Sequence, residues 1–143
     1  MKTMDSALTF RPATTDDTPR IEEIIRQAQA QMRAAGSLQW QDGYPAAADI
    51  ARDIGRGEGY VLCKSGTPAT IIAYGAVVFD GEAAYEAIEG RWLTEEPYLV
   101  IHRLAVAGGE QGRGMATQFM RRAEALARTK GFGSFRIDTN FDN

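Results

Sequence analysis

A glycine-rich segment, residues 108–114 (GGEQGRG), lies between a run of strand-forming residues and a run of helix-forming residues. The strand-forming run, residues 98–106 (YLVIHRLAV), is rich in β-branched and aromatic residues and contains neither Gly nor Pro. A strand that bends into a helix leaves backbone N–H groups unpaired at the helix start, with the positive end of the helix dipole behind them. The segment therefore predicts an anion site, and we expect the anion to be a phosphate or pyrophosphate.

Two common phosphate-binding patterns do not fit this segment. A Walker A loop needs Lys and then Ser or Thr after its last Gly, whereas Arg113 and Gly114 follow Gly112. The dinucleotide pattern G-x-G-x-x-G would need a Gly where the chain has Thr117. The pattern that does fit is Q-x-x-G-x-A, over residues 111–116.

In this setting, after the strand sequence IHRLAV and at the start of a helix, QGRGMA resembles the acetyl-CoA-binding signature of the GCN5-related N-acetyltransferases, the GNAT superfamily. The resemblance covers residues 9–143. It implies transfer of an acetyl group from acetyl-CoA to a primary amine of a small molecule or peptide by direct attack. The structural alternative is a βα turn whose glycines serve only tight packing.

The resemblance also implies which residues hold the cofactor. Backbone groups of the strand would contact the pantetheine and thioester, and backbone N–H groups of the loop would contact the pyrophosphate. The strand residues are Leu104, Ala105 and Val106, and the loop residues are Gln111, Gly112, Arg113, Gly114, Met115 and Ala116. Arg113 would add a charge and Thr117 a hydroxyl, Asn140 and Asn143 would line the cofactor, and no metal is expected.

His102 is the single histidine of the chain. It stands two residues before Leu104, so we expect both side chains on one face of the strand. An imidazole titrates near neutral pH and is suited to accept a proton from an alkylammonium, directly or through water. His102 is therefore the candidate catalytic base, and the alternative is a histidine that only packs on the sheet.

Family members often use a Tyr on the helix after this point to protonate the CoA sulfur, and the sequence as given has no such residue. This absence favours an alternative function, a non-catalytic acyl-CoA-binding module that acts as a sensor or interaction partner. The acceptor site would be built from loop aromatics, namely Trp40, Tyr44, Tyr85 and Trp92, which alternatively act as lids on the core. Acidic residues nearby, Asp42, Glu86 and Glu89, would attract a cationic substrate or merely be solvated.

The chain has the length and composition of one soluble domain. It has 143 residues, of which 44% are hydrophobic and 24% charged. A net charge of −3 and a pI of about 5.2 argue against nucleic acid or an anionic membrane as a partner. No apolar run approaches a membrane span and no signal peptide is evident, so we expect a cytoplasmic protein, with a homodimer as one possible assembly. The lone cysteine, Cys63, is expected to be buried and inert.

The expected elements run β, two helices, three strands, helix, strand. The strands are residues 8–14, 60–64, 70–80, 98–106 and 134–139, and the helices are residues 18–36, 46–57 and 114–130. This order predicts a mixed α+β sheet with a parallel pair late in the chain. It also resembles the GNAT fold, in which the parallel strands splay apart beyond the signature. Family members continue with a further helix and strand, so residues 1–143 are expected to be one GNAT domain that lacks this C-terminal part.

Overall fold

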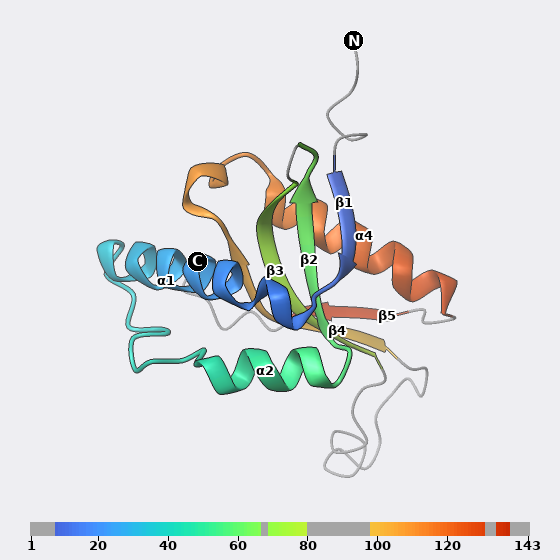
Figure 1. Ribbon diagram of the computed structural model, residues 1–143, viewed down its shortest axis with the longest axis horizontal. Coiled ribbons are helices and arrows are strands. Elements are labelled where there is room, and N and C mark those ends of the chain that lie inside the picture. The colour runs from blue at the N-terminus through green and yellow to red at the C-terminus, as the bar shows by residue number, and fades with distance from the viewer. Residues whose placement is uncertain (1–7, 67–68, 80–97, 131–133, 138–143) are drawn as a thin grey trace.

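The computed structural model describes residues 8–66, 69–79, 98–130 and 134–137, which form a mixed sheet with helices on both faces (Figure 1). The strands lie in the order β1 (Leu8–Pro12), β2 (Gly59–Lys64), β3 (Thr70–Phe79), β4 (Tyr98–Val106) and β5 (Ser134–Ile137). Neighbouring strands from β1 to β4 are antiparallel, and β5 pairs with β4 in parallel. The predicted α+β fold with a late parallel pair is therefore confirmed.

One face of the sheet is covered by α1 (Thr18–Ala34) and α2 (Ala47–Gly55). The apolar stripe of α1 recurs at three- and four-residue intervals, as an amphipathic helix requires. It consists of Ile21, Ile24, Ile25 and Ala28, all buried. These side chains form one core cluster with Ile50 of α2 and with Val61, Cys63, Tyr74 and Ala105 of the strands.

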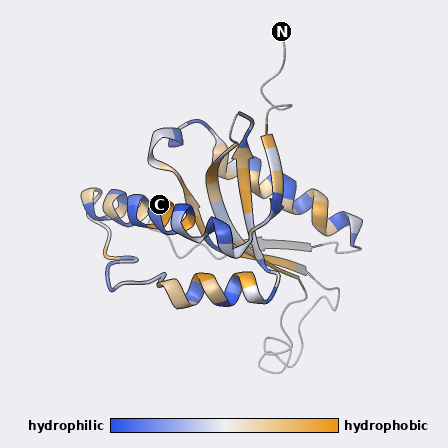
Figure 2. Cartoon of the chain, in the orientation of Figure 1, coloured by the Kyte–Doolittle hydropathy of each residue, from blue (hydrophilic) through white to orange (hydrophobic). Residues whose placement is uncertain are grey.

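The opposite face is covered by α4 (Met115–Thr129), which crosses behind the strands in Figure 1. Its buried residues, Phe119, Ala123 and Ala127, form a second cluster with Leu62, Val77, Leu99 and Ile101. Figure 2 shows the result, with apolar residues concentrated on the strands between the helices and hydrophilic residues on the outer surfaces of the helices. The sheet is thus held between two separate cores.

A β-bulge interrupts β4 where it passes β3. Tyr74 pairs with Ala105 and Ala76 pairs with His102, so two residues of β4, Arg103 and Leu104, lie opposite one residue of β3. The extra residue bends the strand and reverses the alternation of its side chains.

The bulge overturns one sequence-based interpretation. Leu104 packs in the α4 cluster with Ile101, although a regular strand would place residues 101 and 104 on opposite faces. His102 follows Ile101 and pairs with Ala76, so it lies on the α1 and α2 face. The prediction that His102 shares a strand face with Leu104 is therefore wrong, because the extra residue falls between them.

Cys63 lies in β2 and is buried, as predicted. Burial raises the pKa of its thiol, which favours the unreactive protonated form. In the part of the chain that the structure describes, no helix is long and apolar enough to cross a bilayer.

Candidate functional site

The segment after β4 begins with a short 3₁₀ turn, Gly108–Glu110, and side-chain contacts tie residues 108–111 to α1, β2 and β4. The N–H of Gly108 donates to Oε1 of Gln27 on α1 at 2.7 Å. Glu110 forms an ion pair of 2.8 Å with Lys64 at the end of β2. The side-chain amide of Gln111 donates to the carbonyl oxygen of Val106 at 3.0 Å, which closes the end of β4. The start of the loop is therefore fixed by side-chain contacts that the sequence did not indicate.

The two glycines of the signature adopt backbone conformations that disfavour a side chain. Gly112 has φ of +79° and Gly114 has φ of +78°, both in the left-handed region. Gly114 is also the N-cap of α4, and no side chain caps this helix. Left-handed residues that alternate with ordinary ones turn successive N–H groups toward one side, the geometry of an anion-binding nest.

Several N–H groups at this point have no partner among the described residues. The first hydrogen bond of the helical ladder runs from Gln118 N–H to the carbonyl of Gly114, at 3.0 Å. The N–H groups of Met115, Ala116 and Thr117 precede it and have no partner within the helix. The positive end of the α4 dipole reinforces them, so this end of the helix is suited to a phosphate.

The described residues leave space around the two signature glycines. A Cβ added at Gly112 or Gly114 would meet no described atom within 4 Å. Arg113 and Thr117 are exposed beside them, whereas Met115 and Ala116 are half-buried. The N–H of Gln111 already has a partner within the loop, because it donates a long hydrogen bond of 3.4 Å to the carbonyl of Gly108. No described side chain therefore covers the Cβ positions of these two glycines.

In the described part of the sheet, only the first half of β4 is paired with β5. Its parallel pairing with β5 runs from Tyr98 to Ile101, yet β4 continues to Val106. Within the described residues, no strand pairs with this second half on the β5 side. An extended group can add to such an edge by backbone hydrogen bonds, as a further strand would. This second half of β4 leads into the glycine loop.

Comparison with known proteins bears on this arrangement. Residues 21–143 match the acetyltransferase (GNAT) family. The chain belongs to this family. Members of the GNAT family carry out acetyl transfer and generally use acetyl-CoA. A search of curated proteins found no significant match.

Solved structures of GNAT proteins have the same fold. An acetyltransferase of the GNAT family from Streptococcus agalactiae is 34% identical, with a TM-score of 0.75 over 93% of this chain and 76% of that one. A second, from Listeria monocytogenes, is 17% identical, with a TM-score of 0.73 over 93% and 78%. An aminoglycoside acetyltransferase from a soil metagenomic sample, solved with sisomicin, is 15% identical, with a TM-score of 0.58 over 96% and 81%. The last two show likeness of fold alone.

The signature residues 111–116 form the bend before α4, whereas His102 and the strand residues are divided between the two faces of the sheet. Leu104 packs toward α4, whereas Ala105 is buried in the α1 cluster. Ala105 is buried, whereas the side chain of Leu104 is only partly covered by its cluster. Asn140 and Asn143 lie outside the described residues.

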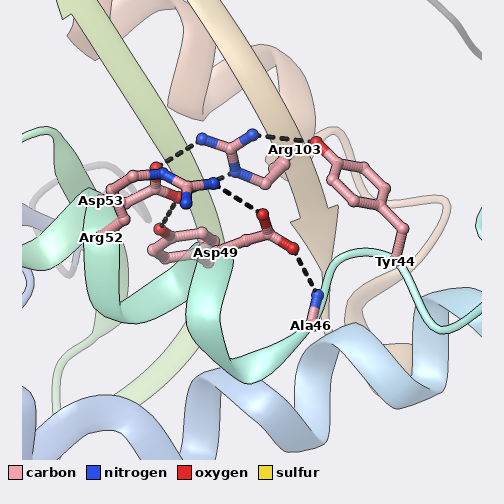
Figure 3. A network of polar contacts seen from close by, with 7 residues as sticks. Tyr44, Ala46, Asp49, Arg52, Asp53 and Arg103 are labelled. Atoms are coloured by element: carbon pink, nitrogen blue, oxygen red, sulfur yellow. Dashed lines mark hydrogen bonds and ion pairs between the residues drawn. The ribbon is translucent and has the colours of Figure 1, made fainter.

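A buried polar network that the sequence analysis missed adjoins the bulge of this GNAT domain (Figure 3). Nε of Arg103 donates to Oδ2 of Asp53 at 2.8 Å, and a second guanidinium nitrogen donates to Oδ1. The Tyr74 hydroxyl donates to the same Oδ2 at 2.6 Å, and Arg103 also donates to the Tyr44 hydroxyl at 2.8 Å. One signal was present in the sequence, since Asp53 stands between Ile50 and Ile54 on the apolar side of α2.

The network alters the titration of its members. Burial lowers the pKa of Arg103, but the hydrogen bonds to Asp53 and Tyr44 outweigh it, so the pKa lies above its usual range. Burial, followed by the hydrogen bond to Asp53, raises the pKa of Tyr74. Arg103 is therefore charged and the Tyr74 hydroxyl is protonated at any pH the protein meets.

The aromatic residues expected at an acceptor site are partly described. Trp40 and Tyr44 meet edge to face, with ring centroids 6.2 Å apart. Trp40 packs against the α1 cluster, which agrees with a lid on the core, whereas Tyr44 is 41% exposed. Asp42, two residues before Tyr44 in the sequence, is exposed. Tyr85, Glu86, Glu89 and Trp92 lie outside the described residues.

Proposed function

We propose that the chain is an N-acetyltransferase that transfers the acetyl group of acetyl-CoA to a primary amine of a small molecule or peptide. The observation that carries the proposal is the set of N–H groups at the start of α4 that have no partner among the described residues, together with the second half of β4, which no described strand pairs on the β5 side. Membership of the GNAT family supports acetyl transfer from acetyl-CoA. The named aminoglycoside enzyme shares the fold at 15% identity, so it gives no guide to the acceptor of this chain.

The residues present fit acetyl-CoA. A pyrophosphate would accept hydrogen bonds from the N–H groups of residues 112–116, with the hydroxyl of Thr117 and the charge of Arg113 beside it. An extended pantetheine would lie along the edge formed by residues 104–106. Asn140 and Asn143, outside the described residues, are proposed to line the same ligand.

When bound, acetyl-CoA supplies an activated acetyl group, so that a new N–C bond replaces the C–S bond while the amine loses a proton and the sulfur gains one. His102 is proposed to take up the proton of the amine, directly or through water. His102 lies on the face of the sheet that α1 and α2 cover. Arg103 binds Tyr44 on the same face, which supports an approach of the acceptor amine from that side. We also propose that the protein is located in the cytoplasm and can form a homodimer.

The test is thiol release from acetyl-CoA in the presence of a broad panel of primary amines, with an amine-free reaction as the control. Amine-dependent release and an acetylated product detected by mass spectrometry are expected. Calorimetric titration with CoA is run in parallel. Tight binding of CoA without release for any amine would replace this proposal with the non-catalytic sensor, and no binding at all would reject the site.

A further inference from the structure

Arg103 is the extra residue of the bulge and has φ of +56°. A residue with a Cβ is strained in this left-handed conformation, and the strain persists only where the surroundings hold the residue in place. Bulges also reorient backbone groups next to binding sites. The bulge of β4 lies immediately after the last residue pair that β4 makes with β5, Ile101 and Ile137. The strained residue thus stands where the described pairing between β4 and β5 has ended.

The side chain of Arg103 supplies the restraint. It forms a two-pronged ion pair with Asp53, and the two side chains are only 14% and 2% exposed. Oδ2 of Asp53 accepts a further hydrogen bond from Tyr74, so both carboxylate oxygens are paired. The planar guanidinium fork allows one orientation of Arg103 against this carboxylate. The bulge is therefore fixed by a contact between β4 and α2.

The same guanidinium reaches the segment between α1 and α2. It donates to the Tyr44 hydroxyl at 2.8 Å, and the carbonyl of Tyr44 accepts a second hydrogen bond, of 3.0 Å, from Gln29 of α1. Figure 3 shows Arg103 between Asp53 and Tyr44, with the Tyr44 ring beside β4. Tyr44 is one of the aromatic residues expected on the acceptor side. One side chain therefore joins the acceptor-side segment to the strand edge.

A contribution to stability alone is a weak explanation for this arrangement. Removing two charges from water offsets most of the attraction between them, so a buried ion pair often adds nothing over apolar residues of the same size. The ion pair between Arg103 and Asp53 instead fixes the backbone conformation of the bulge. This is the segment where backbone atoms would meet the thioester.

We propose that Arg103 is a positioning residue for acetyl transfer. Its ion pair with Asp53 holds the bulge of β4 in the conformation that presents the backbone of residues 104–106 to the thioester. Its hydrogen bond to Tyr44 holds the acceptor-side segment against the same point. The catalytic part of this inference rests on the proposed function, whereas the control of the bulge does not.

The experiment compares Arg103→Gln with wild type and with Arg128→Gln, which removes the same charge from an exposed ion pair on α4. For Arg103→Gln we expect kcat to fall by about a hundredfold, as for a misplaced reacting group, while the KM for acetyl-CoA changes by less than about twofold. Amide hydrogen exchange at residues 102–105 of the ligand-free protein should accelerate by about tenfold or more. Arg128→Gln should match wild type in all three measurements.

Two further variants separate positioning from folding. Asp53→Asn combined with Arg103→Met removes both charges and leaves Tyr74 an acceptor, so the fold should survive while kcat stays as low as in Arg103→Gln. Tyr44→Phe should raise the KM for the amine by about fivefold and leave the exchange at residues 102–105 unchanged.

The outcomes are distinct. Wild-type kcat and unchanged exchange in Arg103→Gln, or wild-type kcat in the folded double variant, would overturn the inference. If the wild-type protein releases no thiol with any amine, the proposed function fails, and the exchange measurement still decides whether Arg103 controls the bulge.

Discussion

The ring of Phe119 lies directly against Gly75: a Cβ added at residue 75 would come within 2.8 Å of Cζ and 2.9 Å of Cε1 of this ring. Phe119 stands in the second turn of α4, and Gly75 lies in β3 opposite the bulge of β4. The absence of a side chain at residue 75 therefore lets the helix that follows the glycine loop rest on the sheet beside the bulge.

Gly75→Ala should destabilise the protein. Phe119 is completely buried, so its ring cannot move aside without disturbing the α4 cluster. We expect a loss of about 1 to 3 kcal/mol in the free energy of unfolding, typical of an overpacked core. Urea denaturation measures this loss. Gly55→Ala, at a position with no atom within 4 Å of the added Cβ, is the control, and an equal effect in the two variants would contradict the contact.

Gly112→Glu and Gly114→Glu should abolish the binding of CoA. Each adds a carboxylate where the pyrophosphate is proposed to lie, and like-charge juxtaposition of about 3 kcal/mol corresponds to a loss of about a hundredfold or more in affinity. Isothermal titration calorimetry with CoA measures the loss.

Two controls isolate the cause. Gly112→Ala has the same left-handed backbone strain without the charge, so it should weaken binding much less than Gly112→Glu. Gly55→Glu adds the same charge at an exposed position on α2. CoA affinity equal to wild type in Gly112→Glu would refute the placement of the pyrophosphate.

His102→Gln should lower the rate of acetyl transfer more strongly near neutral pH than near the pKa of the amine. A proton acceptor in the site matters most where the amine is largely protonated, and its removal matters less as pH approaches the pKa of the amine. The measurement is the pH dependence of kcat/KM for wild type and variant. An unaltered profile would remove His102 from the site, and a loss of the same size at every pH would indicate a structural role.

Asp17 should support the stability of the fold above about pH 4 and lose this effect in acid. The hydrogen bonds from Arg11, at 2.9 and 3.1 Å, outweigh burial, and with a third from the Thr14 N–H they lower the pKa of Asp17. A carboxyl whose pKa is lower in the folded state stabilises that state above its unfolded pKa, and the stabilisation is lost as pH falls through the folded pKa.

Asp17→Asn should therefore reduce the free energy of unfolding by about 1 kcal/mol at pH 7, and the difference should shrink at pH 3. Urea denaturation at both pH values gives the comparison. Asp16→Asn, at an exposed neighbouring position, is the matched control. A difference that is equal at both pH values would show that the charge of Asp17 has no part in it.

Much of the fold follows from local sequence patterns. The stripe of Ile21, Ile24 and Ile25 predicts α1, and the β-branched residues before the glycines predict β4 with the bounds that the structure has. Gly112 and Gly114 adopt the left-handed conformation that a phosphate-binding bend requires. These features depend on neighbours along the chain, so the sequence contains them.

The missed features depend on contacts between distant residues. A bulge at Arg103 leaves no mark in a run that has strand composition throughout, and it places His102 on the face opposite Leu104. The partner of Arg103 is 50 residues away on α2, and that of Gly108 is 81 residues away on α1. Only the packing of helices on the sheet brings such pairs together, and no local pattern encodes it.

The ties from Gln27, Lys64 and Gln111 to the start of the glycine loop have a thermodynamic consequence. They order residues 108–111 when the protein folds, so this part of the loop has little conformational freedom left to lose on binding a ligand. If CoA binds at this loop, its binding should carry a small entropic cost and require little rearrangement of the backbone.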